Sequence, residues 1–154
     1  MIVQYNTEVE DSHKTIVVKE KEYEYKDSIG NSPDKIVDMM NELFRLDRMA
    51  EEYAYLICMN NKGRIIGLFE IAHGTVDSAI VSSRDVFMKA LLIGATNIAV
   101  VHNHPSGDTT PSRQDDEVFK RLKSASEILT VKLTDYLIVG RGEYVSYHEL
   151  GKCN

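Results

Sequence analysis

Apolar and polar residues follow one another along the chain in blocks that predict buried strands alternating with amphipathic helices. The continuous apolar run at residues 53–59 is typical of a strand covered on both faces. An Asn-Asn-Lys-Gly turn follows it, and residues 64–72 predict an antiparallel partner strand. Residues 97–104 and 131–140 predict further buried strands, and residues 143–150 predict a last strand after an Arg-Gly turn.

Three segments between these strands show the apolar spacing of amphipathic helices. In the first of them, Ile36, Met39, Met40 and Leu43 recur every three or four positions, which predicts one buried helix face. Serine precedes each segment, and a serine side chain can accept hydrogen bonds from the free N–H groups of a helix start. The expected caps and helices are Ser32 with 33–46, Ser83 with 84–94, and Ser112 with 113–129.

The chain divides by composition into an N-terminal arm and one domain. Residues 1–31 form a polar arm, and its stretch Thr-Ile-Val-Val-Lys-Glu-Lys-Glu-Tyr predicts one or two strands. Residues 32–154 alternate helices with buried strands, which indicates an α/β fold of two or three layers.

Composition and charge narrow the functional classes. A chain of 154 residues with 43% apolar residues suits one globular domain. The net charge of −6 argues against a protein that coats nucleic acid, so we expect no direct nucleic-acid binding. No apolar run reaches the ~18 residues that cross a bilayer, and the first residues do not resemble a signal peptide. We therefore expect a cytoplasmic protein without membrane contact, and leave a homo-oligomer open.

The chemistry concentrates in the stretch His-Asn-His-Pro-Ser-Gly-Asp-Thr-Thr-Pro-Ser-Arg-Gln-Asp-Asp, residues 102–116. His102 and His104 are two positions apart at the end of a predicted strand, so their side chains point the same way. After a turn, Asp115 falls in the first turn of the next helix and can face the two imidazoles. Two histidines and one carboxylate leave a fourth position open, as in catalytic zinc sites.

A purely structural interpretation exists for each of these residues. Ser112 and Asp115 together make a good helix start, because the serine caps and the acid suits the positive end of the helix dipole. Asp116 points about 100° around the helix from Asp115 and is the poorer ligand. The combination of ligand types at this spacing favours the metal site over the structural interpretation.

The motif His102-x-His104, seven residues, Ser112, two residues, Asp115 resembles the JAMM motif of the JAB/MPN metallohydrolases. The sequence around this motif is similar to sequences of the RadC branch. The stretches Leu-Thr-Asp-Tyr-Leu-Ile-Val-Gly and Tyr-Val-Ser-Tyr-His-Glu-Leu-Gly are similar to them as well. The resemblance covers residues 32–151. His73 departs from it, since the family often has arginine there. We also expect these residues to lack the helix-hairpin-helix region of longer RadC proteins.

The resemblance implies a fold and a set of roles. The fold is the cytidine-deaminase-like three-layer α/β/α sandwich with a mixed sheet. One Zn²⁺ per chain is held by His102, His104 and Asp115. An upstream glutamate is the general acid and base; Glu51 and Glu52 both qualify by position, and alignment with the family favours Glu52. Ser112 stabilises the oxyanion of a tetrahedral intermediate.

Two classes of function follow from this resemblance. The first is a zinc-dependent metallohydrolase that cleaves a peptide or isopeptide bond in a peptide or protein substrate. The alternative is an interaction module associated with DNA repair or mobile elements, in which the zinc site is structural or vestigial. A third reading, zinc-dependent hydrolysis of another bond such as an amidine, stays open because a fold does not determine a substrate.

Overall fold

The computed structural model describes residues 1–74 and 81–154, and a mixed β-sheet lies at their centre. Within these residues the sheet has seven strands in the order β2-β1-β4-β3-β5-β6-β7. β1 is parallel to β4 and β5 is parallel to β6, whereas all other neighbours are antiparallel. The strands are β1 (Ile2–Val9), β2 (Thr15–Tyr23), β3 (Glu52–Met59), β4 (Ile65–Gly74), β5 (Asn97–Asn103), β6 (Lys132–Gly140) and β7 (Glu143–Ser146).

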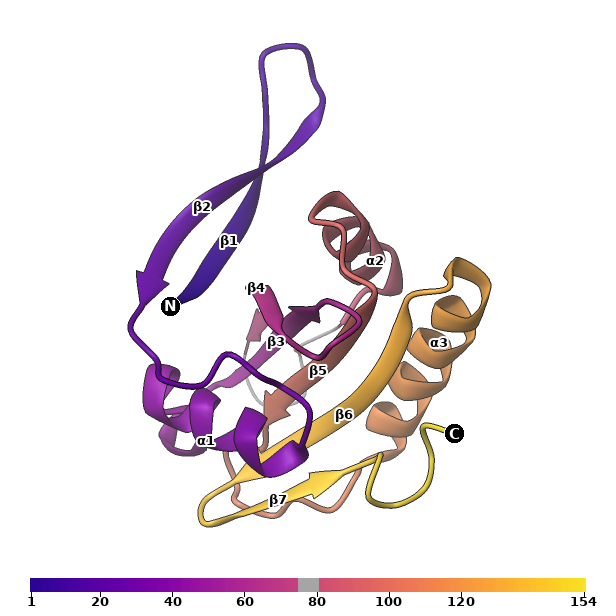
Figure 1. Cartoon of the computed structure of the whole chain (residues 1–154). Coiled ribbons are helices and arrows are strands. Elements are labelled where there is room, and N and C mark those ends of the chain that lie inside the picture. Colours follow the sequence, from indigo (N-terminus) through magenta and orange to yellow (C-terminus); the bar gives the residue numbers. More distant parts are fainter. Residues whose placement is uncertain (75–80) are drawn as a thin grey trace.

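Helices cover both faces of the sheet, so the molecule has three layers (Figure 1). α1 packs on one face, and α2 and α3 pack on the other. The predicted fold class, an α/β/α sandwich with a mixed sheet, is confirmed. The helices are α1 (Pro33–Phe44), α2 (Ser83–Leu92) and α3 (Arg113–Leu129), with the short 3-10 helix η1 (Leu46–Arg48).

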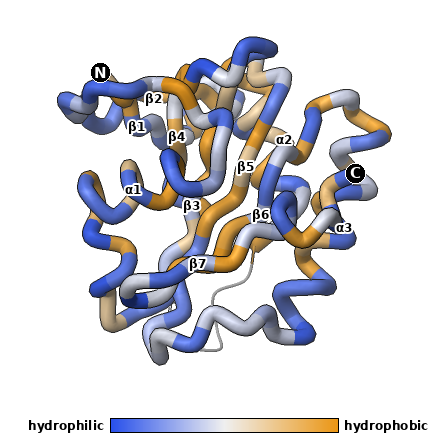
Figure 2. The backbone as a smooth tube through the Cα atoms, turned by 60° about the horizontal axis from the view of Figure 1, so that its bottom comes forward, coloured by the Kyte–Doolittle hydropathy of each residue, from blue (hydrophilic) through white to orange (hydrophobic). Residues whose placement is uncertain are grey.

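The run of apolar residues in β3 is explained by burial on both faces of the strand. Leu56 and Cys58 point into the core under α2 and α3, while Ile57 and Met59 point into the core under α1. All four side chains are at most 1% exposed, and full burial of a large apolar side chain stabilises the fold by about 1.5–3 kcal/mol. The neighbouring strand β5 is also largely hydrophobic, which Figure 2 shows as a mostly orange tube.

The helix starts agree with the serine pattern except at one position. Ser32 and Ser112 are the N-caps of α1 and α3, although the Ser32 side chain makes no capping hydrogen bond. The expectation that Ser83 caps α2 is wrong by one residue: Ser82 accepts the hydrogen bond from the backbone of Asp85, and Ser83 is already helical. Two consecutive serines offer the same capping group, so the sequence does not separate them. Among the described helices, none has the length and apolarity to cross a membrane.

The last strand is shorter than predicted, because hydrogen bonds to the buried carboxylate of Asp135 turn the chain after Ser146. β7 ends at Ser146, whose hydroxyl donates to Asp135 at 2.6 Å. The backbone N–H of His148 donates to the other oxygen of Asp135 at 3.0 Å. His148 therefore lies in a turn beyond the strand, and the expected strand at residues 143–150 is corrected to its first half.

The N-terminal residues form a hairpin, β1–β2, that extends away from the body of the protein (Figure 1). β1 joins the main sheet next to β4, with Gln4 opposite Leu68 and Tyr5 opposite Phe69. Gly67 permits this approach, since a Cβ there would lie 2.6 Å from the Tyr5 ring. The division of the chain at residue 31 stays a prediction, and the hairpin contributes to the same sheet as the rest.

Candidate metal centre

His102 and His104 stand at the carboxyl end of β5 and face the same side of the sheet. His102 lies opposite Ala54 of β3 and Ile138 of β6, so strands flank it on both sides. His104 follows the last residue of β5, and its backbone N–H still bonds to Val139 at 2.9 Å. The two imidazole rings are 5.2 Å apart between centroids. Strand alternation thus pairs the rings, as the sequence predicted.

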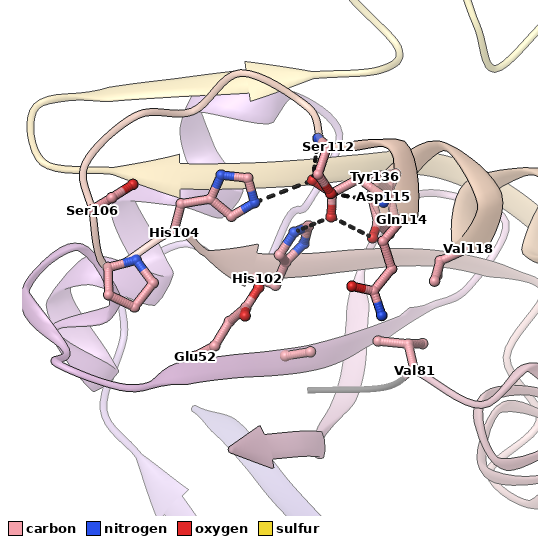
Figure 3. A pocket seen from close by; sticks show the side chains of 12 residues that line it. Glu52, Val81, His102, His104, Ser106, Ser112, Gln114, Asp115, Val118 and Tyr136 are labelled. Atoms are coloured by element: carbon pink, nitrogen blue, oxygen red, sulfur yellow. Dashed lines mark hydrogen bonds and ion pairs between the residues drawn. The ribbon is translucent and has the colours of Figure 1, made fainter. Parts of the chain in front are cut away.

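α3 brings Asp115 to these rings from the opposite side. One oxygen of Asp115 lies 2.8 Å from Nε2 of His102, and the other lies 3.1 Å from Nε2 of His104 (Figure 3). The capping box fixes the carboxylate, because it also accepts a hydrogen bond from the backbone N–H of Ser112 at 2.8 Å. The structural and the ligand interpretations of Asp115 therefore describe the same side chain in one position.

The charges of this cluster depend on each other. Burial opposes ionisation of Asp115, but the contacts with His102 and His104 outweigh burial and hold its pKa well below the ordinary value. Asp115 in turn raises the pKa of His104, against the opposite effect of burial. The structure therefore favours an ionised carboxylate, the form in which Asp115 can bind a cation.

The buried ring of His102 is the strongest indication that this cluster fits a cation. His102 is 4% exposed, and within the described chain neither of its ring nitrogens has a hydrogen-bond partner. Nε2 lies 2.8 Å from one oxygen of Asp115, a contact that pairs opposite charges when the ring is protonated. A buried nitrogen without a partner is costly, and a metal ion would satisfy it. The donor set of imidazole nitrogens and carboxylate oxygens suits zinc.

Glu52 completes the cluster from the first residue of β3. One ligand atom each of Glu52, His102 and His104 lie within 4.8 Å of one another, so these residues form a possible metal site. Glu51 has a different partner: its carboxylate lies 2.5 Å from Nε2 of His73, whose ring stacks on Tyr53. Of the two glutamates, Glu52 lines the cavity around the histidines (Figure 3).

Asn103, between the two histidines, is a site residue that the sequence analysis did not single out. Its side chain points away from the rings and is 1% exposed. The amide donates to the backbone carbonyl of Glu51 at 3.0 Å and accepts from the backbone N–H of Tyr53 at 2.8 Å. Asn103 thus holds the backbone on both sides of Glu52. The only signal in the sequence is that Asn103 stands between the two histidines.

Tyr136 of β6 is a second residue that the sequence analysis missed. Its hydroxyl lies 3.4 Å from Asp115, and its ring centroid lies 5.1 Å from that of His102. Burial and the charge of Asp115 raise the pKa of Tyr136 well above its ordinary value, so the hydroxyl keeps its proton and can donate it. In the sequence, Tyr136 is one apolar residue in a buried strand, with no sign of this contact.

The remaining candidates take up defined places. Ser112 lines the cavity, and its hydroxyl oxygen accepts from the backbone N–H of Asp115 at 3.0 Å, which leaves the hydroxyl hydrogen to donate elsewhere. Asp116 accepts a hydrogen bond from the Tyr147 hydroxyl at 2.6 Å. It does not line the cavity.

The cluster opens into a cavity of about 170 Å³. Its apolar wall is formed by Ala54, Val81 and Val118, and Gln114 presents its amide beside this wall (Figure 3). The loop residues Pro105 and Ser106 close the opposite end. A ligand in this cavity would lie with one part against the apolar wall and a reacting atom near Glu52.

Comparison with known proteins agrees with this geometry. Residues 30–152 match the RadC-like JAB domain. UPF0758 proteins of Caldanaerobacter subterraneus subsp. tengcongensis, Thermotoga maritima and Clostridium novyi are 40%, 42% and 39% identical to this chain. The matches cover 78%, 77% and 79% of this chain and 51%, 52% and 52% of the relatives. The chain thus spans about half the length of the curated relatives it matches. It belongs to the family of RadC-like JAB domains.

Proposed function

We propose that this protein is a zinc-dependent hydrolase that cleaves a peptide or isopeptide bond. The observation that carries the proposal is the buried ring of His102, which lacks a hydrogen-bond partner in the described structure and converges with His104, Asp115 and Glu52. Three of these residues, His102, His104 and Asp115, would hold the ion. This set leaves a coordination position open, the arrangement of a catalytic site.

When bound, the ion would supply Lewis acidity, which would lower the pKa of a water molecule to about 7. The protein supplies the proton transfers and the positioning. Glu52 takes a proton from the attacking water and hands it to the leaving nitrogen as the carbon–nitrogen bond breaks. The hydroxyl of Ser112 donates a hydrogen bond to the oxygen that becomes negative. Asn103 positions Glu52 through hydrogen bonds to the backbone on both sides of it. The hydroxyl of Tyr136 donates a hydrogen bond to Asp115 and orients its carboxylate.

A metal measurement tests the site independently of any substrate. We expect about one zinc per chain in the purified protein by elemental analysis, and loss of most of it in His104→Ala. Zinc retained in a His102→Ala/His104→Ala double variant would refute the site. The matched control is His13→Ala, which removes an exposed histidine of the hairpin and should leave the zinc content unchanged.

Cleavage assays then distinguish the classes of function. The zinc-loaded protein is incubated with a peptide library and with ubiquitin-like conjugates, and products are identified by mass spectrometry. Cleavage at an amide that depends on zinc supports the hydrolase. A protein that binds zinc at this site but cleaves no peptide or conjugate would favour the alternatives, an interaction module with a structural or vestigial zinc or hydrolysis of another bond.

A further inference from the structure

A second cavity adjoins the metal centre on the far side of the loop that follows His104. It has a volume of about 390 Å³. Pro105 and Ser106 line both cavities, so the two share one wall. The side chains of Arg48, from the end of η1, and Arg141, from the turn between β6 and β7, also line the second cavity.

The two arginines give this cavity a charge opposite to that of the chain. The protein has a net charge of −6, yet these two cations outnumber the single carboxylate in the lining, that of Asp47. Within the described chain, no carboxylate lies within 4 Å of either guanidinium group, whereas Arg113 and Arg121 on α3 both pair with Glu117. The cavity therefore offers unused donors to an anion.

We propose that Arg48 and Arg141 bind a carboxylate group of the substrate, so that the enzyme acts on acidic peptide or protein segments. The proposal rests on the proposed hydrolase function. A guanidinium group donates two parallel hydrogen bonds to a carboxylate, and two such groups in one cavity favour an anionic side chain strongly. The substrate would extend from the apolar wall at Val81 and Val118, past Glu52, to the two arginines.

A carboxylate suits this cavity better than a nucleic acid backbone. A nucleic acid presents a phosphate at every step, and its binding requires an extended positive surface. Here only two arginines line the cavity, and the protein as a whole is acidic, so it would repel a long polyanion. One acidic residue near the scissile bond satisfies both arginines and avoids that repulsion.

Hydroxamates with a tethered acid test this subsite on the zinc-loaded protein. A series of linker lengths ending in a carboxylate is compared with the matched methyl esters by calorimetry. We expect the best carboxylate to bind about 10-fold tighter than its ester, because only the acid engages the arginines. The double variant Arg48→Gln/Arg141→Gln should bind both compounds equally, with the ester's affinity unchanged. Arg121→Gln, on the exposed face of α3, is the control and should keep the preference.

The outcomes separate the two proposals. If neither compound binds, the metal site has failed; if both bind equally to the unmodified protein, the subsite has failed. A titration of the metal-free protein with acetate decides the subsite without zinc. We expect saturable NMR shifts at Arg48, Arg141 and Gly107, which are absent in the double variant. A non-saturable response, or phosphate saturating these shifts at a concentration about 10-fold lower than acetate, would overturn the carboxylate assignment.

Discussion

The side-chain amide of Asn103 accepts a hydrogen bond from the backbone N–H of Tyr53 at 2.8 Å. Together with its bond to the carbonyl of Glu51, this contact joins the end of β5 to the start of β3. The two histidines and Glu52 come from these two strand ends. Asn103 therefore links the strand end that carries the two histidines to the strand start that carries Glu52.

Replacing Asn103 with alanine should lower the rate of hydrolysis strongly and the unfolding free energy only moderately. We expect about 1–3 kcal/mol loss of unfolding free energy, because two buried backbone groups lose their partner. The rate of cleavage should fall by about 10-fold or more, since a displaced general base loses much of its effect. Zinc content should stay near one per chain. Urea unfolding, elemental analysis and the turnover rate measure the three quantities.

Asn97 provides a matched control for this variant at the other end of β5. Its amide donates to the carbonyl of Asn60 at 3.0 Å, away from the metal centre. Asn97→Ala removes one hydrogen bond and not two, so it should lose less stability, about 0.5–1.5 kcal/mol, and keep full turnover. Equal losses of turnover in both variants would show that Asn103 acts only on stability.

Asp115 and Asp116 should differ in their effect on the metal. Asp115→Asn keeps the size of the side chain and an oxygen for the N–H of Ser112, but it removes the charge that neutralises a dication. We expect its zinc affinity to fall by about 100-fold or more, beyond the range seen when only a supporting group is lost. Asp116→Asn keeps an oxygen that can accept from the Tyr147 hydroxyl, and it should bind zinc normally. A competition titration with a chromophoric chelator measures both; the reverse result would move the ligand to Asp116.

Gly140 should be needed for the loop that carries Pro105 and Ser106. A Cβ at Gly140 would lie 2.6 Å from the carbonyl oxygen of Gly107 and 2.7 Å from Thr109. Gly140→Ala must therefore push the loop away, at a cost of about 1–3 kcal/mol in unfolding free energy, and we expect turnover to fall with it. Gly142→Ala strains the neighbouring turn through its φ of +76° but meets no atom within 4 Å, so it should lose stability and keep turnover. Full activity in Gly140→Ala would contradict the role of the loop.

The carboxyl group of Asp135 should make stability depend on pH. Burial raises its pKa, although hydrogen bonds from Ser146 and the backbone oppose that change. A carboxyl group with a raised pKa in the folded state stabilises the fold when protonated, and this contribution is lost as pH rises from about 4 through the folded pKa. The unfolding free energy of Asp135→Asn minus that of the unmodified protein should therefore increase from pH 4 to pH 7. Denaturant unfolding at several pH values measures this difference, and a constant or falling difference would contradict the expected sign.

Much of the fold follows from local rules that the sequence displays. The apolar run of β3, the turn after it and the N-cap positions Ser32 and Ser112 each depend on neighbouring residues, and each agrees with the prediction, although only Ser112 caps with its side chain. One error lies where a distant contact decides, because the end of β7 depends on the carboxylate of Asp135. The other, the cap of α2, is a local choice between two consecutive serines.

The candidate site divides in the same way. Strand alternation pairs His102 with His104, and the start of the next helix, after one loop, places Asp115 against both rings. Asn103 and Tyr136 act through partners on other strands, and their sequence neighbours give no sign of this. The choice between Glu51 and Glu52 needed the family resemblance, since both stand at the start of one strand.

The comparison of Glu52→Gln with Glu51→Gln tests the central claim most directly. Glutamine keeps the size of the side chain but cannot take a proton at neutral pH. Both variants are assayed with zinc content measured on the same samples and a peptide or conjugate that the unmodified protein cleaves. We expect Glu52→Gln to keep its zinc and to lose ~10²-fold or more in rate, while Glu51→Gln, which loses only a contact with His73, stays near full rate. A Glu52→Gln protein that holds zinc and cleaves at the unmodified rate would contradict the account.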